Sequence, residues 1–246
     1  RQMCIRDSIK GADVSIMPEL ERNGTKFYDN GIEQDGLTIL KNHGVNWIRV
    51  RIWNNPYVVG PEGVGGGNTD EAKAIEMAKR AKALGMKVLV DFHYSDFWVD
   101  PGQQKKPDAW KNDSGDKLVD DVYAYTAKVM QDFNAQGVTP DMVQVGNELN
   151  NGMLWPEAQL TEDNPNGYKF LAKLQEQYIF SLLITMRQSD PEYLPLKHFP
   201  IPGNKRIYIT LPRYSPVKCY HKHRYYNSCN KSAKIKYLCE YKSKHP

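Results

Sequence analysis

The sequence of 246 residues predicts an α/β fold, a (β/α)8 TIM barrel of which only the first four βα units are recognisable. Strand-like segments alternate with helical segments through the first two-thirds of the chain, which favours a parallel sheet with right-handed crossovers. Each strand-like segment finishes in polar residues, and the carboxyl ends of the strands form the active-site face of a barrel. Polar residues at all four strand ends favour a barrel over a doubly wound sheet.

Four segments that begin with apolar residues are the predicted strands, at residues 11–16, 45–53, 86–96 and 143–148. The helices predicted between them occupy residues 32–43, 69–84 and 118–133. In the first of these helices Ile32, Leu37 and Leu40 stand at near-helical spacing. The second begins with Thr-Asp-Glu and ends before Gly85, and both features are typical of helix boundaries.

The fourth predicted strand runs directly into Asn147 and Glu148. A carboxyl group beside an amide suits sugar chemistry, because the acid can protonate a glycosidic oxygen while the amide binds a neighbouring hydroxyl. A glutamate at a strand end can also be a solvated rim residue, so this pair alone is a weak signal. The three other strand ends strengthen it, since they carry Asp, Arg, Trp, His and Tyr.

Several longer runs make the sequence resemble glycoside hydrolase family 53, the arabinogalactan endo-β-1,4-galactanases. The matching runs are Gly11–Ser15, Arg49–Pro56, Asp91–Pro101, Gln104–Trp110, Gln144–Glu148 and Gly152–Pro156. The resemblance covers residues 9–174, which we expect to be the N-terminal half of a glycosidase barrel. It implies a retaining hydrolase that cleaves β-1,4-galactosidic bonds in galactan or arabinogalactan.

By this resemblance Glu148 is the general acid/base, with a pKa lifted by a neighbouring carboxylate so that it can serve both steps. Asn147 would bind the sugar 2-hydroxyl and the nucleophile. Arg49 would keep the nucleophile ionised, although Arg51 lies on the same face and the two could exchange roles. The alternative for the two arginines is a purely structural buried pair.

Substrate contacts are expected from further residues near the strand ends. The predicted substrate-binding residues are Asp13, Arg51, Trp53, Asp91, His93, Tyr94, Trp98 and Trp155. The residues after the third strand suit hydrogen bonds to sugar hydroxyls, or else a satisfied polar network beneath the site. The loop tryptophans, Trp110 included, suit stacking on pyranose rings, and the alternative for each is a place in the core.

The last part of the chain differs in character from the rest. Residues 1–174 hold 20 Lys and Arg against 25 Asp and Glu, a net charge of −5, whereas residues 175–246 hold 13 against 4, a net charge of +9. The resemblance places the nucleophilic glutamate on a seventh strand, but no matching run occurs in residues 175–246. We therefore expect a frame-shifted or disordered, non-homologous tail, with a divergent or fused module as the alternative. The nucleophile is then absent and the chain inactive.

Residues 1–8 look like an artefact of assembly, and no signal peptide is visible before residue 11. The resemblance nevertheless implies an extracellular, monomeric enzyme with no nucleic-acid partner and no membrane attachment. We expect no cofactor and no metal; a calcium site, if the protein has one, would lie in later loops. Two alternatives remain: a related hydrolase acting on β-linked glucan or mannan, and a non-catalytic carbohydrate-binding or inert half-barrel.

Overall fold

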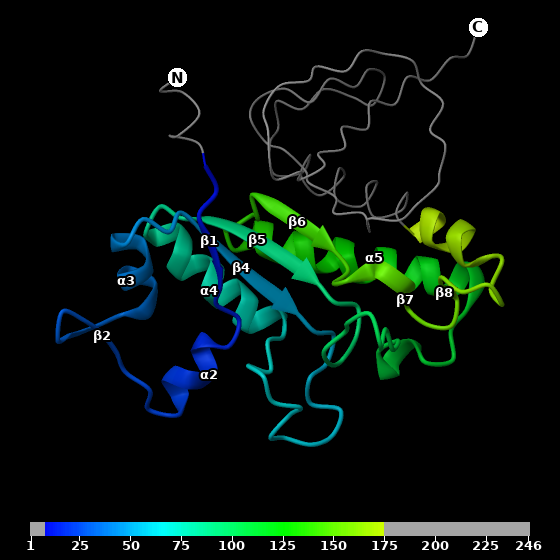
Figure 1. Cartoon of the computed structure of the whole chain (residues 1–246), viewed down its shortest axis with the longest axis horizontal. Helices are drawn as coiled ribbons and strands as arrows, with labels where there is room; N and C mark the ends of the chain where they lie inside the picture. Colours follow the sequence, from blue (N-terminus) through cyan, green and yellow to red (C-terminus); the bar gives the residue numbers. More distant parts are fainter. Residues whose placement is uncertain (1–7, 175–246) are drawn as a thin grey trace, which may run out of the picture. The chain divides into compact units, whose positions relative to one another are not determined.

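The computed structural model of the protein describes residues 8–174. The expectations for the two ends of the chain, residues 1–7 and 175–246, lie outside the described residues. Within the described part, one parallel sheet has the strand order β1-β4-β5-β6 (Figure 1). Its strands are Gly11–Asp13 (β1), Trp47–Ile52 (β4), Lys87–Phe92 (β5) and Met142–Val145 (β6). These are the four predicted strands in their predicted order, so the strand–helix alternation is confirmed.

The two faces of the sheet differ in polarity because side chains alternate along each strand. On one face Val50 and Val90 pair in register, and both are fully buried, as are their apolar neighbours along β4 and β5. On the other face the register aligns Arg51 with Asp91 and Asp91 with Gln144. The apolar face is therefore covered by helices, and the polar face carries the residues predicted to act on substrate.

Helices cover the apolar face of the sheet (Figure 1). They are Gly36–Asn42 (α3), Glu71–Ala83 (α4) and Gly115–Ala135 (α5). Asp35 and Asp70 cap α3 and α4, since their carboxylates accept hydrogen bonds from the Thr38 and Lys73 amides at 2.8 and 3.0 Å. Apolar side chains at 3–4 residue spacing along α4 and α5 pack on the sheet and form the core. Burying each large side chain of this kind contributes roughly 1.5–3 kcal/mol.

The predicted helix over residues 32–43 was wrong at its start. Residues Ile32–Gln34 form strand β3, which pairs antiparallel with Phe27–Asp29 (β2). Asn30 and Gly31 turn the hairpin with φ of 50° and 79°. An Asn-Gly pair between two extended segments favours such a turn, because both residues tolerate positive φ. The helix begins only at Gly36, after its cap.

All four strands are shorter than the predicted segments, and for β1 and β5 the backbone shows where the strand ends. Strand β1 stops at Asp13, whose carboxylate accepts a hydrogen bond from the Ser15 amide at 3.0 Å and turns the chain. Strand β5 stops at Phe92, and Tyr94 adopts a φ of 55°, which no strand residue adopts. The remaining elements are Met17–Arg22 (α2), Asp108–Trp110 (η1), Leu149–Asn151 (η2), Gly152–Met153 (β7) and Ala158–Gln159 (β8), and residues 167–174 are helical.

Candidate active site at the strand ends

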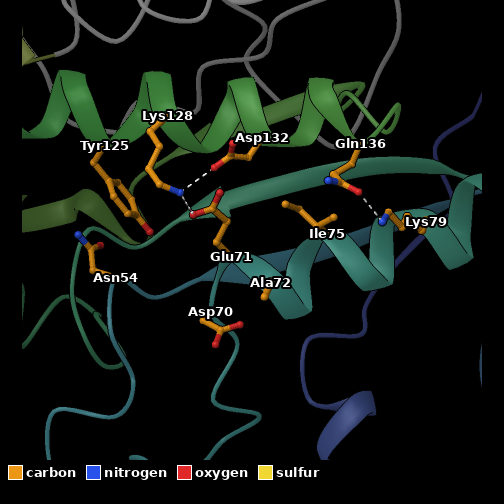
Figure 2. Close-up of a pocket in the computed structure, with 10 residues that line it drawn as sticks. All are labelled: Asn54, Asp70, Glu71, Ala72, Ile75, Lys79, Tyr125, Lys128, Asp132 and Gln136. Atoms are coloured by element: carbon orange, nitrogen blue, oxygen red, sulfur yellow. Dashed lines mark hydrogen bonds and ion pairs between the residues drawn. The ribbon is translucent and has the colours of Figure 1, made fainter.

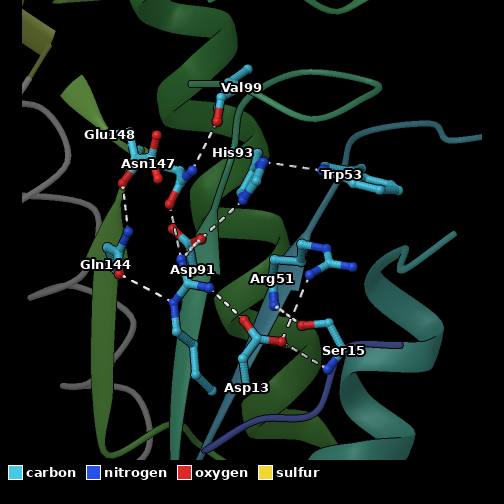
Figure 3. A network of polar contacts seen from close by, with 12 residues as sticks. Asp13, Ser15, Arg51, Trp53, Asp91, His93, Val99, Gln144, Asn147 and Glu148 are labelled. Carbon is cyan, nitrogen blue, oxygen red and sulfur yellow. Dashed lines mark hydrogen bonds and ion pairs between the residues drawn. The ribbon is translucent and has the colours of Figure 1, made fainter. Parts of the chain in front are cut away.

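A polar network joins the carboxyl ends of the four strands, and Asp13, Asp91, Gln144 and Asn147 point toward one another in it (Figure 3). Arg49 is its centre. Its guanidinium contacts the carboxylates of Asp13 on β1 and Asp91 on β5. It also donates to the side-chain oxygen of Asn147 at 3.0 Å and to that of Gln144, on β6, at 3.4 Å. One side chain on β4 thus ties together residues from three other strands, as expected for a strand-end site in a parallel sheet.

Asp91 is the most deeply buried charge of this network, with no exposed surface. The same carboxylate oxygen, Oδ2, contacts Arg49 and lies 3.0 Å from Nε2 of His93. Burying a carboxylate is costly unless it is paired and hydrogen-bonded. The Arg49 guanidinium provides the ion pair and the hydrogen bond. Nε2 of His93 lies close to the same oxygen without making a hydrogen bond, and Oδ1 of Asp91 has no hydrogen-bond partner among the described residues.

The tautomer of His93 follows from its second contact. The indole N–H of Trp53 lies 3.0 Å from Nδ1 of His93, and an indole nitrogen can only donate. Nδ1 must therefore accept, which places the proton of the neutral imidazole on Nε2, facing Asp91. A ring turned by 180° would set carbon atoms against both partners and lose both contacts.

Arg51 lies on the same face as Arg49 but is held by different groups. Its guanidinium is stacked between two tryptophan rings, 5.1 Å from the centre of Trp53 and 4.9 Å from that of Trp98. It donates to the backbone carbonyl of Gly66 and lies 3.7 Å from Asp13. Burial lowers the pKa of Arg51, partly offset by the charge of Asp13. The loop around Gly66 is thereby attached to the end of β4.

The carboxylate of Asp13 stays ionised in this setting. Burial raises its pKa, but hydrogen bonds from Ser15 and the guanidinium of Arg49 outweigh burial, and the net effect is a pKa below the usual 3.8. Two carboxylates, Asp13 and Asp91, therefore balance two guanidinium groups in the network. The balance allows four charges to lie at the strand ends with little net charge.

Asn147 and Glu148 follow β6 directly, and their environments differ. The Asn147 side chain is buried, with its oxygen on Arg49 and its nitrogen donating to the Val99 carbonyl at 2.8 Å. Glu148 is exposed and adopts a left-handed backbone, with φ of 52° and ψ of 50°. Gly146, with a φ of 76°, makes this turn possible, since a Cβ there would lie 2.6 Å from the Leu149 side chain. The strand end thus presents an exposed carboxyl beside a fixed amide.

Two of the predicted substrate-binding residues, Tyr94 and Trp53, are buried, and Tyr94 faces away from this site. Tyr94 is 1% exposed, its ring stacks on Phe92, and its hydroxyl lies 3.0 Å from Oγ1 of Thr126 on α5. It belongs to the helix-facing core, because the positive φ at residue 94 turns the chain over. Trp53 is also buried, at 1% exposed, so its ring contacts Arg51 and His93 and has no free face for a sugar.

Of the other tryptophans, Trp98 and Trp155 have side chains exposed to solvent, as stacking on a sugar ring requires, and Trp110 does not. Trp98 is 37% exposed, with one face against Arg51. Trp155 is partly exposed, and its indole donates to the Asn151 carbonyl at 2.9 Å. Trp110 is buried and packs edge-on against Tyr125, as its core alternative predicted. The substrate contacts of Trp98 and Trp155 stay predictions.

Sequence reasoning missed two glutamines of this region. Gln144 was placed in the fourth strand with no role, although strand alternation puts it on the face of Asp91. Gln104 was seen only as part of a matching run; its side chain is 1% exposed and bonds to the backbone of residues 147 and 148. No local pattern indicates such a contact, because it joins two loops more than 40 residues apart.

A separate groove of about 600 Å³ lies between α4 and α5, and none of its lining residues belongs to the network around Arg49 (Figure 2). Across it the ammonium of Lys128 lies 2.7 Å from both Glu71 and Asp132. Burial and the nearby Asp132 raise the pKa of Glu71. These contacts join the two helices, and we assign the groove a structural role.

Two negative findings apply to residues 8–174. No cluster of three or more His, Cys, Asp or Glu side chains in this range could hold a metal ion. None of the helices described there combines the length and apolar character needed to cross a membrane.

Comparison with known proteins agrees with the geometry. Residues 9–180 match the sequence pattern of Glycosyl hydrolase family 53. An endo-beta-1,4-galactanase of Bacillus subtilis (strain 168) is 55% identical over 148 residues, which are 60% of this chain and 34% of that protein. An arabinogalactan endo-beta-1,4-galactanase of Humicola insolens is 38% identical over 148 residues, 60% of this chain and 42% of that protein.

Solved structures show the same likeness. The GH53 catalytic domain of Ignisphaera aggregans superposes with a TM-score of 0.67 at 40% identity, covering 82% of this chain and 50% of that one. A fungal beta-1,4-galactanase superposes with a TM-score of 0.62 at 35% identity, covering 71% and 48%. The chain thus spans half or less of the length of these relatives. The described sheet and helices are part of a TIM barrel, and the chain belongs to glycosyl hydrolase family 53.

Proposed function

We propose that this protein contributes the acid/base half of a retaining endo-β-1,4-galactanase site that hydrolyses β-1,4-galactosidic bonds in galactan or arabinogalactan. The observation that carries the proposal is the strand-end constellation itself. An exposed Glu148 follows an Asn147 whose amide is fixed by Arg49 and Val99. Relatives in the same family are named as galactanases.

In the first step, the Glu148 carboxyl gives its proton to the oxygen that links two galactose units, while a second carboxylate attacks the anomeric carbon. The bond to the leaving sugar breaks, and a covalent glycosyl-enzyme ester forms. In the second step, the Glu148 carboxylate takes a proton from water, whose oxygen displaces the enzyme ester with net retention. We assign the second carboxylate to a part of the barrel outside residues 8–174.

The polar network supports these steps because its hydrogen bonds and ion pairs fix the orientation of its side chains. Asn147 has its side-chain oxygen bound to Arg49, so its amide nitrogen is directed toward Val99 and retains one further N–H. That N–H is suited to the sugar 2-hydroxyl, a contact that strengthens in the transition state. Asp91 and Asp13 hold the Arg49 guanidinium on two sides. We further infer an extracellular, monomeric enzyme acting on pectin side chains.

The test joins residues 9–174 to the carboxyl-terminal part of the Bacillus subtilis relative, which supplies the rest of the barrel. The chimera should release β-anomer first from galactan, as followed by NMR, and should act far less on β-glucan or mannan. Glu148→Gln should lower galactan turnover by about 10²–10⁴-fold, since general acid–base catalysis contributes that much. Glu162→Gln, an exposed control, should leave it unchanged. Undiminished turnover by the Glu148 variant, or an initial α-anomer, would contradict the proposal.

A further inference from the structure

The Gln104 side chain reaches the backbone that carries the candidate acid/base. Its Nε2 donates to the Asn147 carbonyl at 2.8 Å, to the Glu148 carbonyl at 3.4 Å and to the Asp100 carbonyl at 3.2 Å. Three carbonyl oxygens around one amide nitrogen settle which end of the amide faces them. The opposite orientation would set the amide oxygen against three acceptors, which is repulsive.

The backbone that Gln104 contacts is unusual. Glu148 has a φ of 52°, a left-handed conformation that residues with a Cβ rarely adopt and that costs of order 1–2 kcal/mol. Such a conformation persists only where the surrounding structure enforces it. Other groups support this turn as well: the Asn147 side chain is bound to Arg49 and Val99, Gln144 donates to the Gly146 carbonyl at 3.0 Å, and the Asn150 amide donates to the Glu148 carbonyl at 2.8 Å. Among the hydrogen bonds of the described residues, the one to the Asn147 carbonyl comes from Gln104.

Gln104 is itself held rigidly enough to enforce that conformation. Its side chain is 1% exposed, and its backbone carbonyl accepts a hydrogen bond from the Trp155 amide at 2.8 Å. Lys105 forms an isolated parallel bridge with the same tryptophan. The contact therefore comes from a loop that is fixed on both sides of the residue.

We propose that Gln104 is a positioning residue: its amide holds the Asn147–Glu148 peptide in the left-handed turn and so sets the direction of the Glu148 carboxyl. The backbone part of this proposal concerns the folded chain alone. Its catalytic part rests on the proposed function, because it assumes that Glu148 delivers the proton.

The backbone part is tested by hydrogen exchange on the 246-residue chain. Gln104→Met fills similar space without an N–H donor, and it should speed exchange in the peptide 146–152 at least about tenfold, as expected for local opening. The β4 peptide 47–52 should change less than about twofold. Gln103→Met is the matched control, since this neighbouring glutamine is half-buried and, among the described residues, its side chain donates only to the Asp100 carboxylate at 3.3 Å.

Three results would overturn the proposal. They are unchanged exchange in peptide 146–152, an equal increase in the Gln103 control, and an increase that extends equally to peptide 47–52. If the Met variant does not fold, Gln104→Asn serves instead, because it keeps the amide but is one methylene too short to reach the turn. The Asn variant should show the same local increase, and a global increase there counts against the proposal in the same way.

The catalytic part is tested in the galactan-hydrolysing chimera. Gln104→Met should lower kcat on galactan at least about tenfold with KM nearly unchanged, because a misdirected acid weakens proton transfer. On a dinitrophenyl β-galactoside, whose leaving group departs with little help from an acid, the loss of kcat should stay below about threefold. Equal losses on both substrates would refute a role in directing the acid. Failure of the proposed function can be told apart from failure of the Gln104 proposal. If Glu148 were not the acid, Glu148→Gln would leave galactan hydrolysis intact.

Discussion

Asp91→Asn tests whether the strand-end network depends on the buried charge of Asp91. One oxygen of Asp91 contacts the Arg49 guanidinium and lies 3.0 Å from Nε2 of His93, and no part of the residue is exposed. An asparagine can place its carbonyl oxygen there and still accept a hydrogen bond from Arg49, but the ion pair with that guanidinium is lost. The substitution therefore isolates the charge from the shape.

The expected cost follows from the lost ion pair. Removing one partner of a buried ion pair costs about 3–5 kcal/mol, because the other charge stays behind without its partner. Asp13 still pairs with Arg49, so the lower end of this range applies, about 3 kcal/mol. For a protein of 150–250 residues each kcal/mol changes Tm by about 2–4 °C, so Tm should fall by about 6–12 °C.

Urea unfolding followed by tryptophan fluorescence measures this change. The matched control is Asp116→Asn, whose side chain is 86% exposed and, within residues 8–174, pairs only with Lys173. An exposed pair contributes little, so the control should stay within about 0.5 kcal/mol of the wild type. If Asp91→Asn costs no more than the control, then the charge of Asp91 does not hold the network and the reasoning is wrong.

Three further predictions address other parts of the structure. Asp13→Asn should destabilise the protein above about pH 4 and lose its effect at lower pH. The pKa of Asp13 is below 3.8 when folded, so its contribution with Arg49 is complete above the unfolded value and disappears as pH falls through the folded one. Tyr94→Phe should cost about 1 kcal/mol in a denaturation curve, through the lost Thr126 bond, yet leave galactan hydrolysis by the chimera unchanged. Gly146→Ala should lower the free energy of unfolding by about 1–2 kcal/mol or more, and Tm by several degrees with it. An unchanged Tm would contradict the strain inferred for the turn at Gly146.

The repeat of strand and helix was predictable because it depends on local periodicity. Burial on one face of the sheet requires apolar side chains at every second position, as at Val50, Ile52, Val88 and Val90, and that alternation is legible in the sequence. Asp70 and Gly85 likewise mark the ends of α4 through local hydrogen bonding and a φ of 67°. The Asn30-Gly31 hairpin was equally legible and was overlooked.

The site was predictable only in part. Parallel strands end at the same edge of a sheet, so Asp13, Arg49, Asp91 and Asn147 could be expected to meet there, and the contacts of Arg49 confirm that they do. The chemical role of each of these residues was predicted from the resemblance to family 53, not from its position in the sheet. The roles of these residues toward substrate stay predictions.

The sequence by itself determined the fold class, the order of the strands and the edge at which the polar residues gather, because each depends on patterns a few residues long. Only the tertiary structure decided which side chains of that edge are accessible to a substrate. A positive φ turns Tyr94 into the core, and Arg51 occupies the face that Trp53 would offer to a sugar. The same holds for the Gln104 contact to Glu148. Such outcomes depend on contacts between loops far apart in the chain, and no local pattern encodes them.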